Sequence, residues 1–398
     1  MRETTDILIS GGGVAGLTAA AAFGSAGFRV VCVDPAPPVT EEAEAGADLR
    51  TTAFLQPARR VLEAAGIWPR IAPRGAALRI MRIVDAGGEA PEPRIVTDFD
   101  AAEIGEEPFG WNFPNWLLRR ESVARLAELP NVDFRPGTAT RSVLTREAEA
   151  RVTLSDGAQV SARLLIAADG RASPVREAVG IGVTTMRYGQ KALAFAVTHP
   201  VPHHDVSTEI HRSGGPFTLV PLPDRGGLPS SAVVWMERGP EALRLAALPV
   251  AAFEAEMLAR SAGLLGPLTL VTGRSVWPIV SQIADRFDGE RTALLAEAAH
   301  VVPPIGAQGL NMSLADLACL LDLATAAPDG LGERAMLAAY HRRRWPEVKA
   351  RVMGIDLLNR TSMLAARPLR DLRAGLLNAL YSVAPVRQTL MRAGLGMR

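Results

Sequence analysis

A glycine-rich turn near the beginning of the chain constrains its fold more than any other feature. The turn reads Gly11-x-Gly13-x-x-Gly16, follows a short apolar segment and opens an alanine-rich stretch. A second apolar segment then ends at Asp34. A strand, a turn, a helix and a second strand in this order predict two parallel strands joined by a crossover helix, in a sheet that is covered on both faces.

Each glycine of the turn has a physical role in binding a dinucleotide. Gly11 permits the tight turn, Gly13 lets a pyrophosphate approach the backbone, and Gly16 lets the helix pack closely on the strand. The N-terminus of the helix then points its partial positive charge at the phosphates. Asp34 is placed to accept hydrogen bonds from an adenosine ribose. The motif fits both FAD and NAD, and a glycine turn without a ligand stays open as the alternative interpretation.

Composition and charge exclude several classes of protein. The 398 residues carry 43 basic and 42 acidic side chains, a net charge of +1, so we expect no nucleic-acid partner. With 48% hydrophobic and 21% charged residues, the chain is expected to be globular, with two or three domains for its length.

Cys32 and Cys319 match no metal or redox spacing, so we expect no metal site and a reducing, cytoplasmic location. Glycines interrupt the uncharged stretch 7–28, and we therefore expect neither a transmembrane helix nor a signal peptide there.

Positive charge is concentrated in the last part of the chain. Residues 341–398 carry 12 Lys or Arg against three acidic residues, a net charge of +9, whereas the remainder has a net charge of −8. This asymmetry suggests an anionic surface as a partner for the tail. A helical cap with a solvated arginine face is the alternative, and the two are compatible.

The remaining pattern predicts a parallel sheet that is interrupted by a β-rich insertion. An apolar strand over 163–170 ends abruptly at Asp169-Gly170, and buried-strand character returns over 292–300, ahead of a helix over 309–325. Between them, extended segments over 190–238 indicate a mostly antiparallel sheet. Two further helices are expected over 54–65 and 120–129, and a strand pair over 77–85 and 93–99 with a turn at Gly87-Gly88. The tail is expected to be helical, with breaks at Pro346, Pro368 and Pro385.

Two later motifs bear on the choice of cofactor. These motifs are LLIAADGRASPVREAVGI (164–181) and LLAEAAHVVPPIGAQGLNMSLADL (294–317). In order and spacing they resemble motifs of the flavin-dependent aromatic hydroxylases, the family typified by para-hydroxybenzoate hydroxylase. The chain resembles this family over nearly its whole length, with LRTTAF (49–54) as a further match. The tail that begins YHRRRWPEVKARVMGIDLLNR (340–360) is similar to the ubiquinone-biosynthesis branch.

The resemblance implies cofactor-binding roles for four residues. It places Asp169 and Gly170 between the FAD pyrophosphate and the nicotinamide cofactor. Arg50 would approach the flavin and the pyrophosphate, and Arg120 would lie near the FAD phosphates. For the two arginines surface solvation is the alternative, and for Asp169 a purely strand-ending role.

One pair of residues departs from the family pattern. Members usually have Gly-Asp before Ala-Ala-His, with the aspartate on the ribityl chain of FAD, whereas this chain has Ala296-Glu297. The carboxylate of Glu297 is one methylene longer, so the contact must shift or pass through water. We do not interpret the change as a loss of FAD.

The segment before the helix at 309–325 is expected to contact the flavin ring. Reduced flavin carries negative charge around N1 and the C2 carbonyl, and a helix N-terminus stabilises such charge with its backbone N–H groups and dipole. Gly306, Gly309, Leu310 and Asn311 are therefore assigned to the cofactor. By resemblance, the backbone at Pro304 faces the substrate hydroxyl, and no side chain is assigned as the catalytic group.

The histidines carry no assigned chemistry. The family position of His300 packs near the cofactor, which argues against a role as a base. His199, His203 and His204 lie among prolines and show no metal-ligand pattern, so we expect them in a solvated loop.

The expected fold is α/β. It combines a discontinuous Rossmann-like FAD-binding domain, an inserted β-sheet substrate domain and a helical C-terminal tail. We assign 1–75, 101–182 and 276–340 to the FAD-binding domain, 76–100 and 183–275 to the substrate domain, and 341–398 to the C-terminal helical region.

The resemblance implies FAD-dependent hydroxylation of the aromatic ring of a polyprenylated phenol in ubiquinone biosynthesis. NAD(P)H and O2 would be co-substrates, with oxygen transferred from a flavin hydroperoxide. A polyprenyl substrate lives in the membrane, so we expect a cytoplasmic protein whose basic tail contacts the inner face of the membrane or a biosynthetic complex. The alternatives are a related hydroxylase of a soluble phenol or polyketide, and a catalytically silent flavoprotein partner, for which Glu297 is the one supporting feature.

Overall fold

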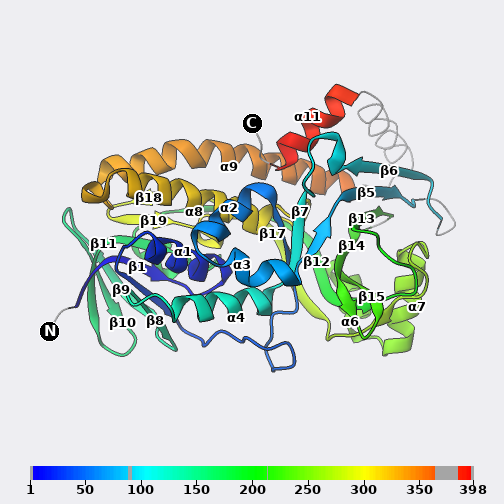
Figure 1. Ribbon diagram of the computed structural model, residues 1–398, viewed down its shortest axis with the longest axis horizontal. Helices are drawn as coiled ribbons and strands as arrows, with labels where there is room; N and C mark the ends of the chain where they lie inside the picture. Colours follow the sequence, from blue (N-terminus) through cyan, green and yellow to red (C-terminus); the bar gives the residue numbers. More distant parts are fainter. Residues whose placement is uncertain (1–2, 88–91, 213, 364–383, 396–398) are drawn as a thin grey trace.

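Two large sheets at opposite ends of the molecule organise the chain (Figure 1). The computed structural model describes residues 3–87, 92–212, 214–363 and 384–395. The expectation of a mixed α/β protein with several sheets is confirmed. The turn expected at Gly87-Gly88, the break at Pro368 and the tail residues Arg367, Arg370, Arg373 and Arg398 fall outside the described residues, in whole or in part.

The first sheet contains the glycine-turn strands. Its strands are β1 (Glu3–Ser10), β2 (Val30–Asp34), β8 (Val132–Pro136), β9 (Thr140–Thr145), β10 (Ala150–Leu154), β11 (Gln159–Ala167), β18 (Asp288–Gly289) and β19 (Thr292–Leu294). They lie in the order β18-β19-β11-β1-β2-β8, with β10 beside β11 and β9 beside β10. From β19 to β8 the strands are parallel, and for β1 and β2 this confirms the prediction from the strand–turn–helix–strand pattern.

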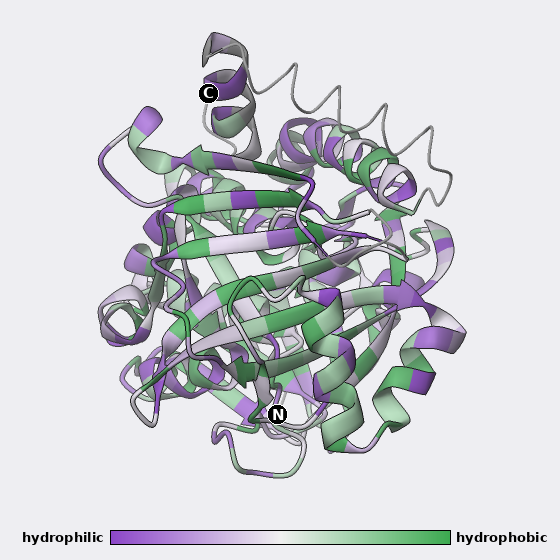
Figure 2. Ribbon diagram, turned by 90° about the vertical axis from the view of Figure 1, so that its right-hand side faces the viewer, coloured by the Kyte–Doolittle hydropathy of each residue, from purple (hydrophilic) through white to green (hydrophobic). Residues whose placement is uncertain are grey.

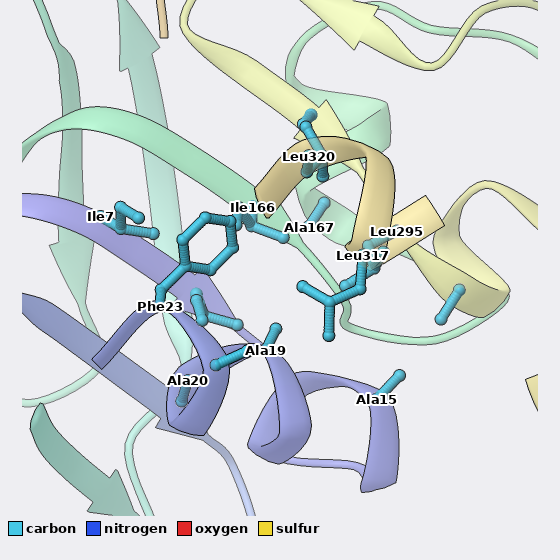
Figure 3. Close-up of a cluster of buried hydrophobic side chains, with 14 of the residues drawn as sticks. Ile7, Ala15, Ala19, Ala20, Phe23, Ile166, Ala167, Leu295, Leu317 and Leu320 are labelled. Carbon is cyan, nitrogen blue, oxygen red and sulfur yellow. The ribbon is translucent and has the colours of Figure 1, made fainter. Parts of the chain in front are cut away.

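An alanine-rich helix packs directly on this parallel sheet. The helix α1 (Val14–Ser25) is buried along nearly its whole length. Figure 3 shows Ala15, Ala19 and Phe23 of α1 together with Ile166 of β11 and Leu317 of a later helix, α8 (Gln308–Ala326). Small side chains on α1 let it lie close to its neighbours, so the turn that precedes it is fixed against the sheet edge.

The second sheet is mostly antiparallel, as the extended segments over 190–238 predicted. Its strands are β5 (Ile80–Asp85), β6 (Ile95–Asp100), β12 (Val183–Thr198), β13 (Val206–His211), β14 (Pro216–Arg225), β15 (Leu228–Arg238), β16 (Thr269–Leu270), β17 (Ser275–Ala284) and β20 (His300–Val301). The order is β20-β17-β12-β15-β14-β13-β5-β6, with β16 beside β12. Figure 2 looks onto this sheet and shows hydrophobic and hydrophilic segments alternating along its strands. Phe195, Trp235 and Phe253 form edge-on and tilted ring contacts in its core.

A small sheet and the remaining helices connect the two large sheets. The small sheet has the order β3-β7-β4, with β3 (Thr51–Leu55), β4 (Ala76–Leu78) and β7 (Gly110–Pro114). The remaining helices are α2 (Gln56–Ala64), α3 (Trp68–Ile71), α4 (Asn115–Leu126), α5 (Pro174–Ala178), α6 (Gly239–Ala247), α7 (Val250–Arg260), α9 (Arg334–Ser362), α11 (Ala384–Leu395) and the 3-10 turns η1 (Ala72–Arg74), η2 (Ala101–Glu103), η3 (Ala296–Ala298) and η4 (Pro328–Gly330).

Three local predictions were wrong. Pro346 does not break the tail but lies inside α9, because Arg344 and Val348 on either side of it are buried and hold the helix in place. The strand expected over 77–85 is interrupted, and its first part, β4, joins a different sheet from β5. The strand expected over 292–300 ends at Leu294, where the chain turns into η3.

Candidate functional site

The carboxyl ends of four parallel strands meet at one edge of the first sheet. Ser10 at the end of β1 lies opposite Ala167 of β11 and Val33 of β2, and Ala167 lies opposite Leu294 of β19. The segments that follow these strands, 11–13, 34–36, 168–170 and 295–297, therefore lie side by side. In open α/β sheets this edge is where ligands bind.

The glycine turn is packed tightly on one side and open on the other. Gly11 has φ +113°, and a Cβ there would lie 2.2 Å from the carbonyl oxygen of Ala168. A Cβ on Gly16 would lie 1.9 Å from the carbonyl oxygen of Gly11. A Cβ on Gly13, by contrast, would have no atom within 4 Å. The backbone at Gly13 therefore has open space beside it.

Asp34 lies directly beneath this turn. Its Oδ2 accepts a 2.6 Å hydrogen bond from the backbone N–H of Gly12, and its Oδ1 accepts one of 2.9 Å from Ala36. The carboxylate is therefore oriented by backbone donors at the end of β2. A ribose hydroxyl bound here would share an acceptor that is already in a fixed position.

Asp169 presents a carboxylate oxygen without a partner. Its Oδ2 accepts a 3.1 Å hydrogen bond from the backbone N–H of Val175, whereas the buried Oδ1 has no hydrogen-bond partner in the described part of the chain. Burial raises the pKa of Asp169 above its ordinary value. Gly170 follows with φ +86°. A buried acceptor of this kind fits a ligand that donates a hydrogen bond.

Arg50 is held in one orientation by an aspartate that the sequence did not single out. Its Nε and Nη2 donate hydrogen bonds of 2.8 and 2.7 Å to the two oxygens of Asp48. Asn115 of α4 donates a further hydrogen bond of 3.1 Å to Asp48. Burial acts to raise the pKa of Asp48, but the hydrogen bonds and positive charge around it outweigh this effect and lower the pKa. The guanidinium of Arg50 also lies 5.6 Å from the ring centre of Trp277 in β17, so Arg50 connects the segment before β3 with the second large sheet.

The second predicted arginine, Arg120, does not join this cluster. Its guanidinium lies 5.1 Å from the ring centre of Trp116 and donates a 3.2 Å hydrogen bond to Glu121. Its neighbour Arg119 lies on the side of Asp48, with Nη2 3.6 Å from Oδ2. Sequence reasoning missed Asp48 and Arg119, although the position of Asp48 two residues before Arg50 was a usable signal.

Ala296-Glu297, the pair that departs from the family pattern, follows β19 at the same edge. Ala296 has φ +57°, a left-handed conformation that a glycine adopts without strain. The side chain of Glu297 is exposed. The pKa of Arg50 is raised, mainly by its hydrogen bond to Asp48 and in smaller part by the charge of Glu297. Glu297 and Arg50 are therefore close enough to interact electrostatically.

The loop that contains Pro304 and Gly306 leads into α8. Gly306 and Ala307 both have positive φ, +62° and +56°, and no side chain caps the helix. A Cβ added to Gly309, in the first turn, would have no atom within 4 Å. The first turn of α8 thus combines free backbone N–H groups with an accessible surface, which suits stabilisation of negative charge.

Leu310 and Asn311 have structural contacts within this turn. Leu310 packs, partly buried, against the main core. The side-chain amide of Asn311 accepts a 2.8 Å hydrogen bond from the N–H of Leu55 and donates one of 2.7 Å to the carbonyl of Ala53. The side chain of Asn311 therefore ties α8 to β3, and its backbone is the part left to face a ligand.

The buried histidines form structural hydrogen bonds. Nε2 of His300 lies 2.6 Å from Oδ2 of Asp316, and both side chains are buried. The solvated loop expected for the other histidines is wrong for His199, which is 2% exposed and bonded through its ring nitrogens to the Val201 carbonyl and the Ser231 hydroxyl, at 2.8 and 2.9 Å. His204 is exposed. In the ranges that the structure describes, no cluster of three or more potential metal ligands occurs.

These features fit FAD. The helix α1 has no acidic residue in its first turn and no side-chain cap, so its N–H groups are available to a pyrophosphate. The open backbone at Gly13 and the unpartnered oxygen of Asp169 lie at the same sheet edge.

Comparison with known proteins agrees with this geometry. A family model described as FAD binding domain matches residues 4–354. The ubiquinone hydroxylase UbiL of Rhodospirillum rubrum is 33% identical, and the alignment covers 99% of this chain and 90% of that protein. The 3-demethoxyubiquinol 3-hydroxylase of Escherichia coli is 25% identical over 99% of both chains. The structure of p-nitrophenol 4-monooxygenase PnpA from Pseudomonas putida covers 100% of both chains with a TM-score of 0.80 at 19% identity, which shows a shared fold. The resemblance seen in the sequence is thereby confirmed, and the chain belongs to the FAD-binding-domain family of flavin-dependent monooxygenases, in the branch of the ubiquinone hydroxylases.

Proposed function

We propose that this protein hydroxylates the aromatic ring of a polyprenylated phenol in ubiquinone biosynthesis, using FAD, NAD(P)H and O2. The observation that carries the proposal is the similarity to UbiL, which extends over nearly the full length of both chains. The domain assignment stays part of the proposal, with 1–75, 101–182 and 276–340 as the FAD-binding domain, 76–100 and 183–275 as the substrate domain, and 341–398 as the C-terminal region. Strand β17, nearly all of which falls within 276–340, nevertheless pairs with β12 of the second sheet.

The chain's own residues would bind and orient the cofactor. Bound FAD supplies the hydride acceptance and oxygen chemistry, so the protein needs no nucleophile of its own. Gly13 and the N-terminus of α1 would hold the pyrophosphate, Asp34 the adenosine ribose, and Asp169 a donor group of the cofactor. Arg50, held by its hydrogen bonds to Asp48, would supply positive charge beside the cofactor.

An apolar cluster lies between the second sheet and the Pro304 loop, and we place the aromatic ring of the substrate beside it. Met236 and Ile279 are buried there, and Trp277 and Ile305 pack against them. With FAD bound, the cluster would exclude water from the side of the flavin that the loop would face. An electron-rich phenol then reacts without a protein nucleophile, because its own hydroxyl supplies electron density to the ring.

Tyr188, at the edge of this cluster, is unsuited to act as a base. Its hydroxyl lies 2.7 Å from both the Ser281 hydroxyl and the Asp356 carboxylate. Burial raises the pKa of Tyr188 to about 12, so the phenol remains protonated at neutral pH. We assign Tyr188 to the packing of this apolar cluster.

A lipid surface is the proposed partner through which the substrate arrives. Three apolar side chains near the end of α9, Met353, Leu357 and Leu358, are 62%, 63% and 57% exposed. Exposed basic residues, Arg342, Arg343 and Lys349, precede them on the same helix. Apolar side chains beside positive charge fit a membrane with anionic headgroups. We call these six residues the outer face of α9.

Part of the positive charge of the tail is neutralised within the protein. In the described part of the tail, Arg344, Arg351, Arg360 and Arg387 are engaged in ion pairs.

Within the described ranges, α8 has the length and hydropathy of a membrane-spanning helix. Its Leu314, Leu317 and Leu320 are completely buried in the protein core, which accounts for its apolar composition.

Deletion of the gene, followed by mass spectrometry of the quinone precursors, tests the proposal. We expect a polyprenylated phenol that lacks one ring hydroxyl to accumulate. An unchanged quinone pool, in a strain without a second ring hydroxylase, contradicts the pathway assignment. Purified protein should oxidise NAD(P)H and form hydroxylated product from that precursor. If NAD(P)H oxidation were coupled equally well to hydroxylation of a phenol without an isoprenoid chain, a hydroxylase of soluble phenols would be favoured instead. If no hydroxylated product formed at all, the result would favour a silent flavoprotein.

A further inference from the structure

The first residue of α8 is held from three directions. Nε2 of Gln308 donates hydrogen bonds to the carbonyl oxygens of Gly306, at 2.9 Å, and of Gly394, at 3.1 Å. Its Oε1 accepts a hydrogen bond of 3.1 Å from Nη1 of Arg351. Ala307, the preceding residue, has φ +56°, a conformation that an alanine does not hold without support from its surroundings. The position of the helix start thus depends on the groups that bind Gln308.

Arg351 is the outer member of a chain of charged groups that reaches the core. Its Nε donates a 3.3 Å hydrogen bond to Glu347, and the other oxygen of Glu347 accepts one of 2.7 Å from Arg344. Nε of Arg344 donates to Oδ1 of Asp316 at 2.7 Å, and Oδ2 of Asp316 lies beside His300. The side chains of Arg344 and Asp316 are 7% and 0% exposed. Arg351 is therefore oriented by a network whose inner members, Arg344 and Asp316, are buried.

The other contact of Gln308 comes from α11, which is anchored independently. Nε and Nη2 of Arg387 donate hydrogen bonds of 2.9 and 2.7 Å to Oε2 of Glu103. Met391, 7% exposed, packs in a cluster with Leu55 and Phe109. The N–H of Leu55 in turn bonds to Asn311, in the first turn of α8. The helix α11 thus supports the start of α8 both at Gln308 and through β3.

We infer that α11 is a clasp that positions the N-terminus of α8 beside the flavin. Backbone N–H groups at a helix start stabilise negative charge, and this effect falls off within the first turn. Reduced flavin carries more negative charge than oxidised flavin, so a displacement of Gln308 weakens the binding of the reduced form more. Arg387 and Met391 act through Gln308 and Leu55, which makes them positioning residues. The inference rests on FAD binding and is independent of the substrate.

The midpoint potential of the bound flavin tests the inference. It would be measured by reductive titration of the purified FAD-bound protein against a reference dye, for Arg387→Met and for Gln308→Met. We expect reduced FAD to bind about three- to tenfold more weakly relative to oxidised FAD, and a tenfold change lowers a two-electron potential by about 30 mV. The dissociation constant of oxidised FAD and the circular dichroism spectrum should change little, because the glycine turn is untouched.

Two controls separate the clasp from a general effect of charge. Arg392→Met removes a positive charge from an exposed position of the same helix and should leave the potential unchanged. Exchange of the ion pair, with Arg387→Glu and Glu103→Arg together, should restore the native value. If Arg387→Met fails to fold, Glu103→Gln weakens the same anchor without removing the arginine.

The inference is overturned by any of three results. The first is a native potential in both Arg387→Met and Gln308→Met. The second is a shift in Gln308→Met alone, which would leave α11 without a role. The third is an equal shift of the potential in Arg392→Met, which would show that the loss of one positive charge, and not the position of α8, causes the shift.

Discussion

Gly16 lies against Gly11 so closely that a Cβ on Gly16 would stand 1.9 Å from the carbonyl oxygen of Gly11. Gly13, between them in the same motif, has nothing within 4 Å of the position of a Cβ. The motif therefore contains glycines with different tasks. Gly16 brings α1 onto the turn, and Gly13 leaves the space that a pyrophosphate requires.

Alanine substitutions should separate these two tasks. Gly16→Ala overpacks the turn, so we expect the free energy of unfolding to fall by about 1–3 kcal/mol, with weaker FAD binding as a consequence. Gly13→Ala should change the free energy of unfolding by less than about 1 kcal/mol, since the position is an N-cap with open space. It should nevertheless weaken FAD binding at least tenfold. Urea unfolding of the apoprotein and fluorescence titration with FAD measure the two effects, and native FAD affinity in Gly13→Ala would contradict the assignment.

Ala296 stores backbone strain at the end of β19. Its φ of +57° costs an alanine about 1–2 kcal/mol, more than the roughly 0.5–1 kcal/mol of chain entropy that a glycine loses on folding. Ala296→Gly should therefore raise the free energy of unfolding by about 0.5–1 kcal/mol, as measured by urea unfolding. Ala299, with φ −92° and 1% exposure, is the matched control, and Ala299→Gly should lower stability. Equal losses in both variants would refute strain at Ala296.

His199 should make folding sensitive to mild acid. Burial lowers the pKa of His199, as does the charge of His203, while the Val201 carbonyl and the charge of Asp224 act in the opposite direction. A histidine whose pKa is lower in the fold than in the unfolded chain, about 6.5, contributes its full stability above that pH and loses it as the pH falls. The stability advantage of the native protein over His199→Gln should thus shrink between pH 8 and pH 5. His204→Gln, at an exposed position, is the control, and a pH-independent difference for His199→Gln would be evidence against the prediction.

The outer face of α9 should bind anionic vesicles. The exposed side chains of Met353 and Leu357 would be buried in the lipid interface, so Met353→Gln with Leu357→Gln should weaken binding at least about tenfold. Sedimentation with vesicles that contain an anionic phospholipid measures the effect, and purely zwitterionic vesicles or high salt should reduce binding of the native protein. Leu243→Gln on α6, at a residue that is 53% exposed, is the control. The surface would have to be reassigned if the control weakened binding equally, or if the face mediated dimerisation instead.

Much of the site was accessible from the sequence because its parts are local. The glycine turn, Asp34, the strand-ending Asp169 and the departure at Ala296 are each defined by a few neighbouring residues, and the structure brings them to one sheet edge. Parallel pairing of strands β19, β11, β1 and β2 makes this convergence a consequence of topology. Local patterns also led to errors where packing overrides propensity, as at Pro346, which the buried residues around it keep inside α9.

What the sequence by itself determined is the set of short motifs that match FAD and the fold class that presents them. Only the tertiary structure decided which distant partners orient them: Asp48 and Arg119 beside Arg50, and Gly394 on Gln308. Such pairs depend on the path of loops and on side-chain contacts between residues far apart in the chain. No periodicity or spacing encodes those contacts, because hydrogen bonds between distant side chains form only after hydrophobic burial has set the positions of the elements.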